Sequence, residues 1–157
     1  MGAHARSLLP QRGGATHTAV GGALGGVTMP IQVVNGATLK CSMGMAPSTL
    51  VVLPMRMVNV ANQPSATIMD HKALVNILPF GSCMSMANPS VASATSAAMG
   101  VLTPMPCVPN TPAPWAPGGV TVNNTNEVTL DNPSTCTCVF GGVITIANPG
   151  QTQTMVP

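Results

Sequence analysis

Charged and aromatic residues are scarce in this chain. Only 5% of its 157 residues are Asp, Glu, Lys or Arg, whereas an ordinary soluble domain has about 25%. The formal net charge is +2, and Phe80, Trp115 and Phe140 are the only aromatic residues. Because basic patches and stacking rings are lacking, we expect no nucleic-acid partner. A surface of Thr, Asn, Ser and backbone favours a protein docked on a partner, although a free domain with an unusual surface is the alternative.

Long apolar runs are also missing. No run reaches the roughly 18–20 residues of a membrane span, and no apolar stretch of a signal peptide follows Arg6 and Arg12. Glycine and proline number 16 each, and both interrupt helices and favour turns. The 45% of apolar residues argue against a disordered chain. These features predict a small all-β domain of hairpins.

Short strand-like segments alternate with turn signals from residue 31 onwards. The turns carry Asn-Gly, Ala-Pro, Gln-Pro, Pro-Gly-Gly and Asn-Pro sequences. Between them we expect strands over residues 31–34, 38–42, 49–53, 57–60, 67–69, 120–122, 127–130 and 143–146. We expect residues 1–28 to form a flexible N-terminal extension. Alternatively, Met29 is the true first residue and the start is misassigned. The domain is expected over residues 29–151, with a C-terminal tail over 152–157.

Two segments depart from this strand pattern. Asn88 can cap a short helix that begins at Pro89 and ends at Gly100, and its small residues allow close packing against a sheet. Residues 103–117 contain six prolines, which exclude a helix and a central strand. We expect this segment to run extended and to be fixed to the core by Trp115.

The five cysteines allow three interpretations. Structural disulfides are disfavoured by the odd number, while inert buried thiols are common. The third interpretation is one tetrahedral thiolate site, which suits zinc best. His71 could complete this site, or it could be an ordinary surface histidine. A weak internal repeat adds to this, because Cys41 and Cys138 each precede a glycine by three residues and then a β-branched strand.

Catalytic motifs are absent from the sequence. It contains no H-E-x-x-H, no G-x-S-x-G and no phosphate-binding Gly-Lys-Ser/Thr. The three acids, Asp70, Glu127 and Asp131, are scattered, which disfavours a carboxylate pair. Asp70 and Cys107 would be the first candidates in an enzyme, but we expect none.

An ordered run of motifs resembles the PAAR-like spike-tip proteins, some of which were first grouped as a domain of unknown function. The motifs are GATLKCSMG (36–44), PSATIMD (64–70), NILPFGSC (76–83), LTPMPC (102–107) and CTCVFGGVI (136–144). Asn88-Pro89 and Pro114-Trp115 fall between them in the expected order, and the match spans about residues 31–151. Thr67 replaces the name-giving Arg, and Cys41 stands where a His-Gly-Gly would be expected.

The resemblance implies a non-enzymatic protein that caps and sharpens the trimeric spike of a contractile injection system, such as type VI secretion, and assists membrane puncture. It implies a cone-shaped fold whose apex is held by one structural metal ion, and we expect zinc in an all-cysteine site. We predict the ligands Cys41, Cys83, Cys107 and Cys138, with Cys136 in reserve. The expected partner is a trimeric VgrG-like β-helical spike protein, with transient contact to the target membrane. Synthesis in the cytoplasm would be followed by assembly on the spike and export with the particle.

Two rival functions follow from the same sequence. The chain could be an adaptor that loads effector cargo onto the spike through residues 1–28 or the proline-rich segment. It could also be a metal-dependent hydrolase delivered as a toxin, which would need an open coordination position and a base.

Overall fold

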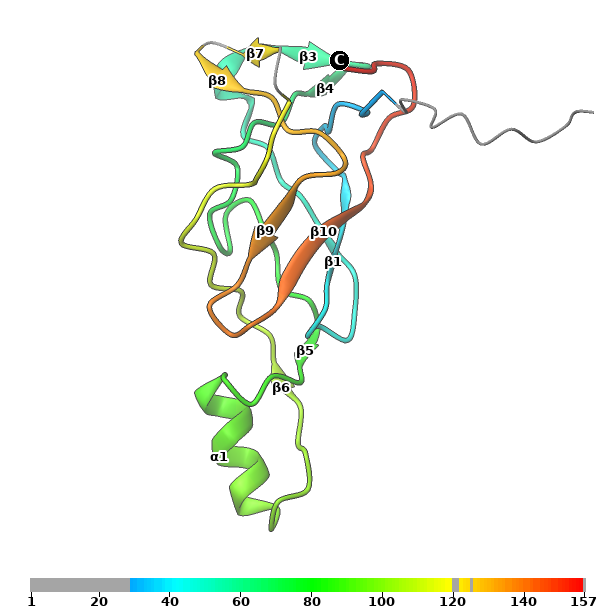
Figure 1. The fold of residues 1–157 in the computed structure, drawn as a ribbon. Coiled ribbons are helices and arrows are strands. Elements are labelled where there is room, and N and C mark those ends of the chain that lie inside the picture. The colour runs from blue at the N-terminus through cyan, green and yellow to red at the C-terminus, as the bar shows by residue number, and fades with distance from the viewer. Residues whose placement is uncertain (1–28, 120–121, 125, 157) are drawn as a thin grey trace, which may run out of the picture.

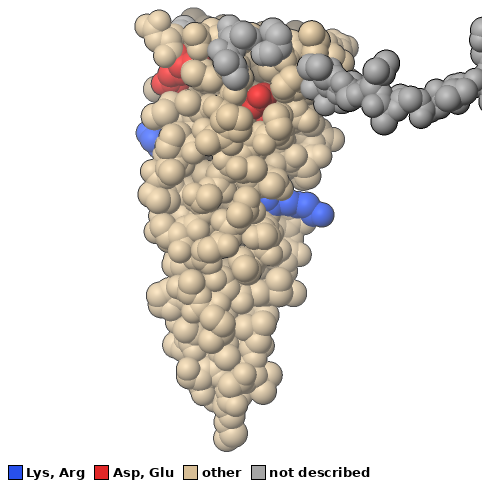
Figure 2. Space-filling view, viewed as in Figure 1, with Lys and Arg blue, Asp and Glu red and all other residues tan. Residues whose placement is uncertain are grey.

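The molecule tapers from a wide end to a narrow one (Figures 1 and 2). The computed structural model describes residues 29–119, 122–124 and 126–156, so the expected N-terminal extension lies outside the described residues. Small hairpins and the C-terminus lie at the wide end, a four-stranded sheet forms the middle, and a single α-helix forms the narrow end (Figure 1). The prediction of a small all-β domain with one short helix is confirmed.

The central sheet is antiparallel, with the strand order β2-β1-β10-β9. The strands are β1 (Thr38–Cys41), β2 (Ser48–Thr49), β9 (Thr135–Thr137) and β10 (Val143–Asn148). Leu39 and Ile144 point into the core and are fully buried, while Lys40 and Thr145 are exposed. This alternation is why the strands expected at 38–42 and 143–146 form where the sequence predicts them.

The remaining strands are two-residue pairs. They are β3 (Asn59–Val60) with β4 (Gln63–Pro64), β5 (Ser82–Cys83) with β6 (Met105–Pro106), and β7 (Asn123–Asn124) with β8 (Glu127–Val128). A 3-10 helix, η1 (Pro54–Arg56), follows β2, and Met57 then adopts a left-handed φ of 52°. The strands expected at 49–53 and 57–60 are therefore shortened, and those at 31–34 and 67–69 form isolated bridges only. Residues 120–121 of another expected strand lie outside the described residues.

Three residues from distant parts of the chain form a closed ring of backbone hydrogen bonds. Val33 N donates to Leu130 O at 2.9 Å, Leu130 N donates to Ala66 O at 3.0 Å, and Ala66 N donates to Val33 O at 3.0 Å. All three side chains are fully buried. Each residue donates to one partner and accepts from the other, which is the pattern that a three-fold axis produces. We call these residues the hydrogen-bond ring.

The residues that flank the ring repeat the same pattern. Each ring residue forms a tripeptide with the residues before and after it in the sequence. The residue after one ring residue forms a β-bridge with the residue before the next ring residue. The three bridges are Val34–Ser65, Thr67–Thr129 and Asp131–Gln32. One chain thus builds an approximately three-fold arrangement out of three unequal segments. Because β4 and β8 end next to the ring, it lies close to the wide-end hairpins (Figure 1).

The helix α1 (Pro89–Ala97) confirms the helix prediction. Asn88 Oδ1 accepts from Ser90 N at 3.0 Å, Pro89 occupies the first turn, and Gly100 follows the end with φ of 88°. The helix contacts β6 of the two-stranded β5–β6 sheet and extends from it to the narrow end (Figure 1). It does not lie flat on the central sheet.

The proline-rich segment and the C-terminus are both fixed to the body of the domain. Trp115 is 1% exposed, and its Nε1 donates to Asp70 O at 3.0 Å, so the predicted anchor is confirmed. Val156 N donates to Pro30 O at 2.7 Å, and Val156 is buried. This contact joins the last described residue to the start of the domain, and the bounds of the expected C-terminal tail stay a prediction. Among the helices that the structure describes, none is long and apolar enough to cross a membrane.

Candidate metal centre

Two cysteines stand at equivalent places below the hydrogen-bond ring. Cys41 ends β1 and Cys138 follows β9, and each comes eight residues after its ring residue (33 to 41 and 130 to 138). A Cβ placed on Gly142 would lie 2.7 Å from Cys41 Sγ and 3.7 Å from Cys138 Cβ. The missing side chain at Gly142 thus leaves room for these two cysteines to approach each other. The repeat noted in the sequence has a structural counterpart here.

We call the three chain segments that follow Val33, Ala66 and Leu130 the arms of the fold, and two further cysteines come from the arm after Ala66. Cys83 in β5 pairs with Met105 in β6, and it also forms a bridge with Gly44, which lies just after Cys41. Cys107 follows β6, and its N donates to Gly81 O at 2.7 Å. Both side chains are buried in the apolar core. The β5–β6 pair therefore brings two thiols to the region where Cys41 and Cys138 lie.

Burial and the neighbouring thiols perturb the pKa values of two of these cysteines. Burial is the main cause that raises the pKa of the Cys107 thiol, and the charges of Cys83, Cys41 and Cys138 raise it further. Burial likewise raises the pKa of Cys41, with added repulsion from Cys138 and Cys83. Backbone hydrogen bonds at Phe80 and at Met43 offset part of these shifts. A divalent cation would relieve the repulsion among the thiolates.

Cys136 has a different environment. It lies opposite Ile144 in the central sheet, is 1% exposed, and its Sγ lies 3.5 Å from Ala113 O. Burial raises its pKa to about 11, and Cys138 is the one thiol that adds to this shift. Such a site suits an inert core thiol. Which of the thiols would bind a metal stays a prediction, as does metal binding itself.

His71 is engaged elsewhere. Its Nδ1 lies 3.0 Å from Thr111 O, and Thr111 Oγ1 donates to His71 O at 2.5 Å. This reciprocal pair fixes the histidine to the proline-rich segment. These two contacts therefore account for the position of His71 without a metal.

The cysteines do not form a finished ligand set. All five are free thiols, so no disulfide links them. Over residues 29–119, 122–124 and 126–156, no three His, Cys, Asp or Glu side chains are arranged closely enough to hold a metal ion. In number and chemical type the four thiols fit zinc, but their side chains would have to turn towards one another to bind it. The chain thus offers the donors without the completed geometry.

The acidic residues serve a separate ion-pair network. Arg56 pairs with Asp70 at 3.2 Å and with Glu127 at 2.5 Å, and Thr67 Oγ1 donates to Glu127 at 2.9 Å. Arg56, Asp70 and Glu127 line a cavity of about 300 Å³ together with Lys72, Asn76 and several apolar residues. Asp131 accepts from Ser134 Oγ. Asp70 and Glu127 are thus occupied as structural acceptors.

The sequence predicts neither the hydrogen-bond ring nor the place of Gly142 beside two cysteines. A signal for the ring exists in the equal spacing from Val33 to Cys41 and from Leu130 to Cys138. The arm after Ala66 carries Leu74 at the equivalent place, so the repeat is hidden there. No sequence signal marks Gly142, because only the structure shows that Gly141 alone needs a positive φ in this turn.

Comparison with known proteins gives one match. The profile of the family described as "Domain of unknown function (DUF4280)" matches residues 33–151, which is most of the chain and includes all five cysteines. No curated protein and no solved structure matches. On the extent of this match, the chain belongs to the family of the domain of unknown function DUF4280.

Proposed function

We propose that this protein is a PAAR-like tip that caps the trimeric spike of a contractile injection system. The observation that carries the proposal is the hydrogen-bond ring of Val33, Ala66 and Leu130 near the wide end of a tapering domain. A single chain that docks on the end of a homotrimer must meet three identical chains. An approximately three-fold interior lets three parts of one chain face those three partners in similar ways.

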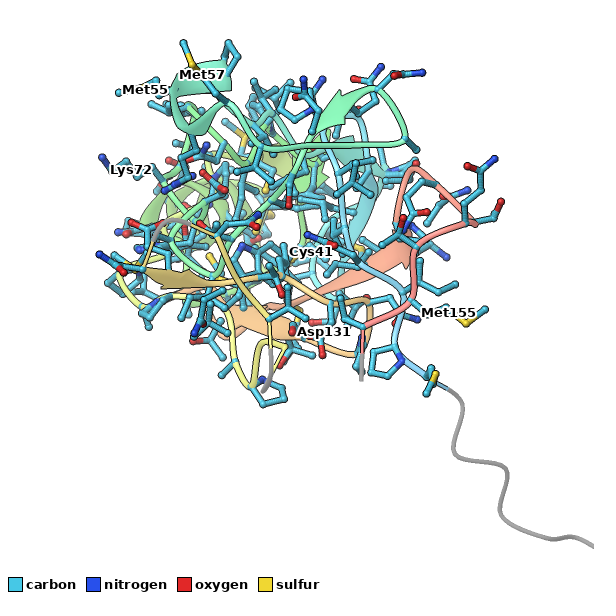
Figure 3. All side chains as sticks on the ribbon, turned by 90° about the horizontal axis from the view of Figure 1, so that it is seen from above. Cys41, Met55, Met57, Lys72, Asp131 and Met155 are labelled. Carbon is cyan, nitrogen blue, oxygen red and sulfur yellow. The ribbon has the colours of Figure 1, made fainter. Side chains whose placement is uncertain are left out.

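The wide end also has suitable chemistry for docking. Exposed methionines surround it: Met29, Met55, Met57 and Met155 are 53%, 81%, 92% and 55% exposed. Met55 and Met57 lie on one side and Met155 lies on the other when the molecule is viewed from this end (Figure 3). Flexible methionine side chains adapt to irregular partner surfaces. The short β3–β4 and β7–β8 hairpins supply strand edges onto which a β-helical spike could add.

A metal ion would strengthen the tapering part below the ring. The residues that would hold it are Cys41, Cys83, Cys107 and Cys138, which come from all three arms. Zinc bound by four thiolates contributes folding free energy directly, which a narrow domain with a small core needs. It would act as a structural link and would supply no catalysis.

The metal assignment is tested by removing thiols one at a time. Cys107→Ser is expected to lower the zinc content measured by mass spectrometry and to lower the Tm. Cys136→Ser is the matched control, because it makes the same substitution at a buried thiol outside the four predicted ligands. An unchanged metal content in the Cys107 variant contradicts the assignment.

The capping function is tested by binding to a spike. The full chain is co-expressed with a trimeric β-helical spike protein encoded in the same injection system, and native mass spectrometry counts the chains. One copy per spike trimer is expected. Met57→Asp should weaken this complex, because it places a charge on the exposed wide-end surface. Met99→Asp is a matched control, since both methionines are more than nine-tenths exposed and have φ near 50° (92% and 52°, 97% and 55°). Three tips per trimer, or no complex at all, refutes the proposal.

A further inference from the structure

The cavity beside the ion-pair network lies on one side of the wide end. It is bounded by η1, which carries Arg56, by β8, which carries Glu127, and by the segment 69–76. Met55 and Lys72 both line the cavity, and they lie on the same side of the molecule in the view from above (Figure 3). The volume of about 300 Å³ is at the lower limit for ligand pockets, so the cavity has room for about one or two amino-acid residues.

The floor of the cavity consists of buried polar groups that already have partners. Asp70 and Asn76 are 5% and 3% exposed. The Asp70 carboxylate accepts hydrogen bonds from Thr67 N at 2.8 Å and from Arg56 at 3.2 Å. Asn76 Oδ1 accepts a hydrogen bond from Lys72 N at 3.3 Å. A floor bonded in this way keeps its shape whether or not a ligand is present.

The walls of the cavity are apolar and reach the surface. They are Leu53, Met55, Met69 and Val75, which are 43%, 81%, 43% and 45% exposed. The backbone fixes the end of the wall that carries Val75, because Lys72 O accepts hydrogen bonds from the N–H groups of residues 75–77 at 2.8–3.3 Å. Apolar walls of this kind gain free energy when an apolar group of a ligand covers them.

One cation of the cavity has no acidic partner. Three of the four carboxylate oxygens of Asp70 and Glu127 already accept hydrogen bonds, and Arg56 pairs with both acids. Lys72 is exposed and forms no salt bridge with any acid in the part of the chain that the structure describes. An ammonium group has three N–H donors and no acceptor. A ligand that neutralises this charge must therefore bring an anionic acceptor.

From these observations we infer that the cavity binds the C-terminal residue of a partner protein. The apolar side chain of that residue would lie against Leu53, Met55, Met69 and Val75, and its free carboxylate would pair with Lys72. A C-terminal residue carries both groups on one Cα, which suits the small volume. An internal segment would need one residue for the apolar group and another for the acid. The inference does not rest on the proposed function, because the cavity would bind such a chain end without a spike.

Short peptides test the inference on the full chain. The probe is acetyl-Gly-Ser-Leu with a free carboxylate, and the matched control is the same peptide ending in an amide. Binding is followed by NMR at the Val75 amide and at the indole N–H of Trp115, the single tryptophan, which donates to the backbone of Asp70. Saturable shifts are expected with the free acid. The amidated peptide should bind about tenfold more weakly, because it lacks the charge-assisted hydrogen bond to Lys72.

Two pairs of variants assign the binding to the cavity. Lys72→Met should lower the affinity for the free acid about tenfold and remove its advantage over the amide. Lys40→Met, at an exposed lysine on β1 outside the cavity, should leave both affinities unchanged. Val75→Asp should abolish binding of the free acid, because it places a like charge in the wall. Val101→Asp, at a valine outside the cavity that is 68% exposed, is the matched control and should bind normally.

Several results would overturn the inference. Absence of saturable shifts rules out binding at the cavity. Equal affinity for the free and amidated peptides, or equal loss in the Lys72 and Lys40 variants, rules out recognition of a chain end. Self-association of the chain in sedimentation experiments that Val75→Asp abolishes would make a second copy the occupant. None of these experiments contains a spike, so this inference and the capping function fail independently.

Discussion

Gly142→Ala is the substitution whose effect follows most directly from the thiol geometry. The new Cβ would lie 2.7 Å from Cys41 Sγ, about 1 Å closer than an ordinary contact between non-bonded atoms. Either the β9–β10 turn shifts or the Cys41 side chain rotates away from Cys138. Overpacking of this size costs about 1–3 kcal/mol. We therefore expect a modest loss of stability without metal, and a larger loss with zinc because Cys41 could no longer turn towards the other thiols.

Gly141→Ala is the control for this substitution. A Cβ on Gly141 would meet nothing within 4 Å, but its φ of 76° makes an L-residue strained by about 1–2 kcal/mol. The two variants thus lose similar stability for different reasons. Urea unfolding of metal-free and zinc-loaded protein separates them, together with zinc content measured by mass spectrometry. Gly141→Ala should keep the stabilisation by zinc, and Gly142→Ala should lose most of it.

One result would refute this reasoning. If both variants retain full zinc content and the same increase in stability with zinc, then Cys41 does not need to face Cys138. The four thiols would then be neighbours in an apolar core rather than ligands of one ion.

Three further predictions concern stability. Arg56→Met should lower the free energy of unfolding by about 2–4 kcal/mol in urea titrations, because it leaves the buried Asp70 carboxylate without its cation. Lys40→Met, on the exposed face of β1, is the control and should change this free energy by less than about 0.5 kcal/mol. Trp115→Phe should cost about 1–3 kcal/mol, measured by circular dichroism, since the indole hydrogen bond and some core volume are lost. Asn88→Ala should cost about 1 kcal/mol and accelerate amide exchange in α1, and unchanged exchange would contradict the capping role.

Part of this fold is readable from the sequence because local signals agree there with the packing. The helix follows from Asn88, Pro89 and Gly100, which act within one or two turns. The strands β1 and β10 follow from alternating burial along several residues. In each case the deciding contacts lie within a short window of the chain.

The rest depends on contacts between distant segments. The tripeptides around Ala66 and Leu130 are too short to show a period, and their pairing is set by the ring. The pairs at Ser82–Cys83 and Met105–Pro106 have few β-branched residues, so propensity gives no signal for them. The choice of Cys138 over Cys136 rests on the repeat shared with Cys41, and it stays a prediction. The orientation of their side chains depends on glycine positions that no local pattern reveals.

The hydrogen-bond ring also determines when the protein can fold during its synthesis. Its third member, Leu130, leaves the ribosome after most of the chain, and the partner of β1 in the central sheet, β10, comes later still. Closing such long loops is entropically costly until the last contacts form, so early segments gain little by pairing alone. A nascent chain therefore remains open until its final strand emerges, and truncated products lack the axis around which the body is organised.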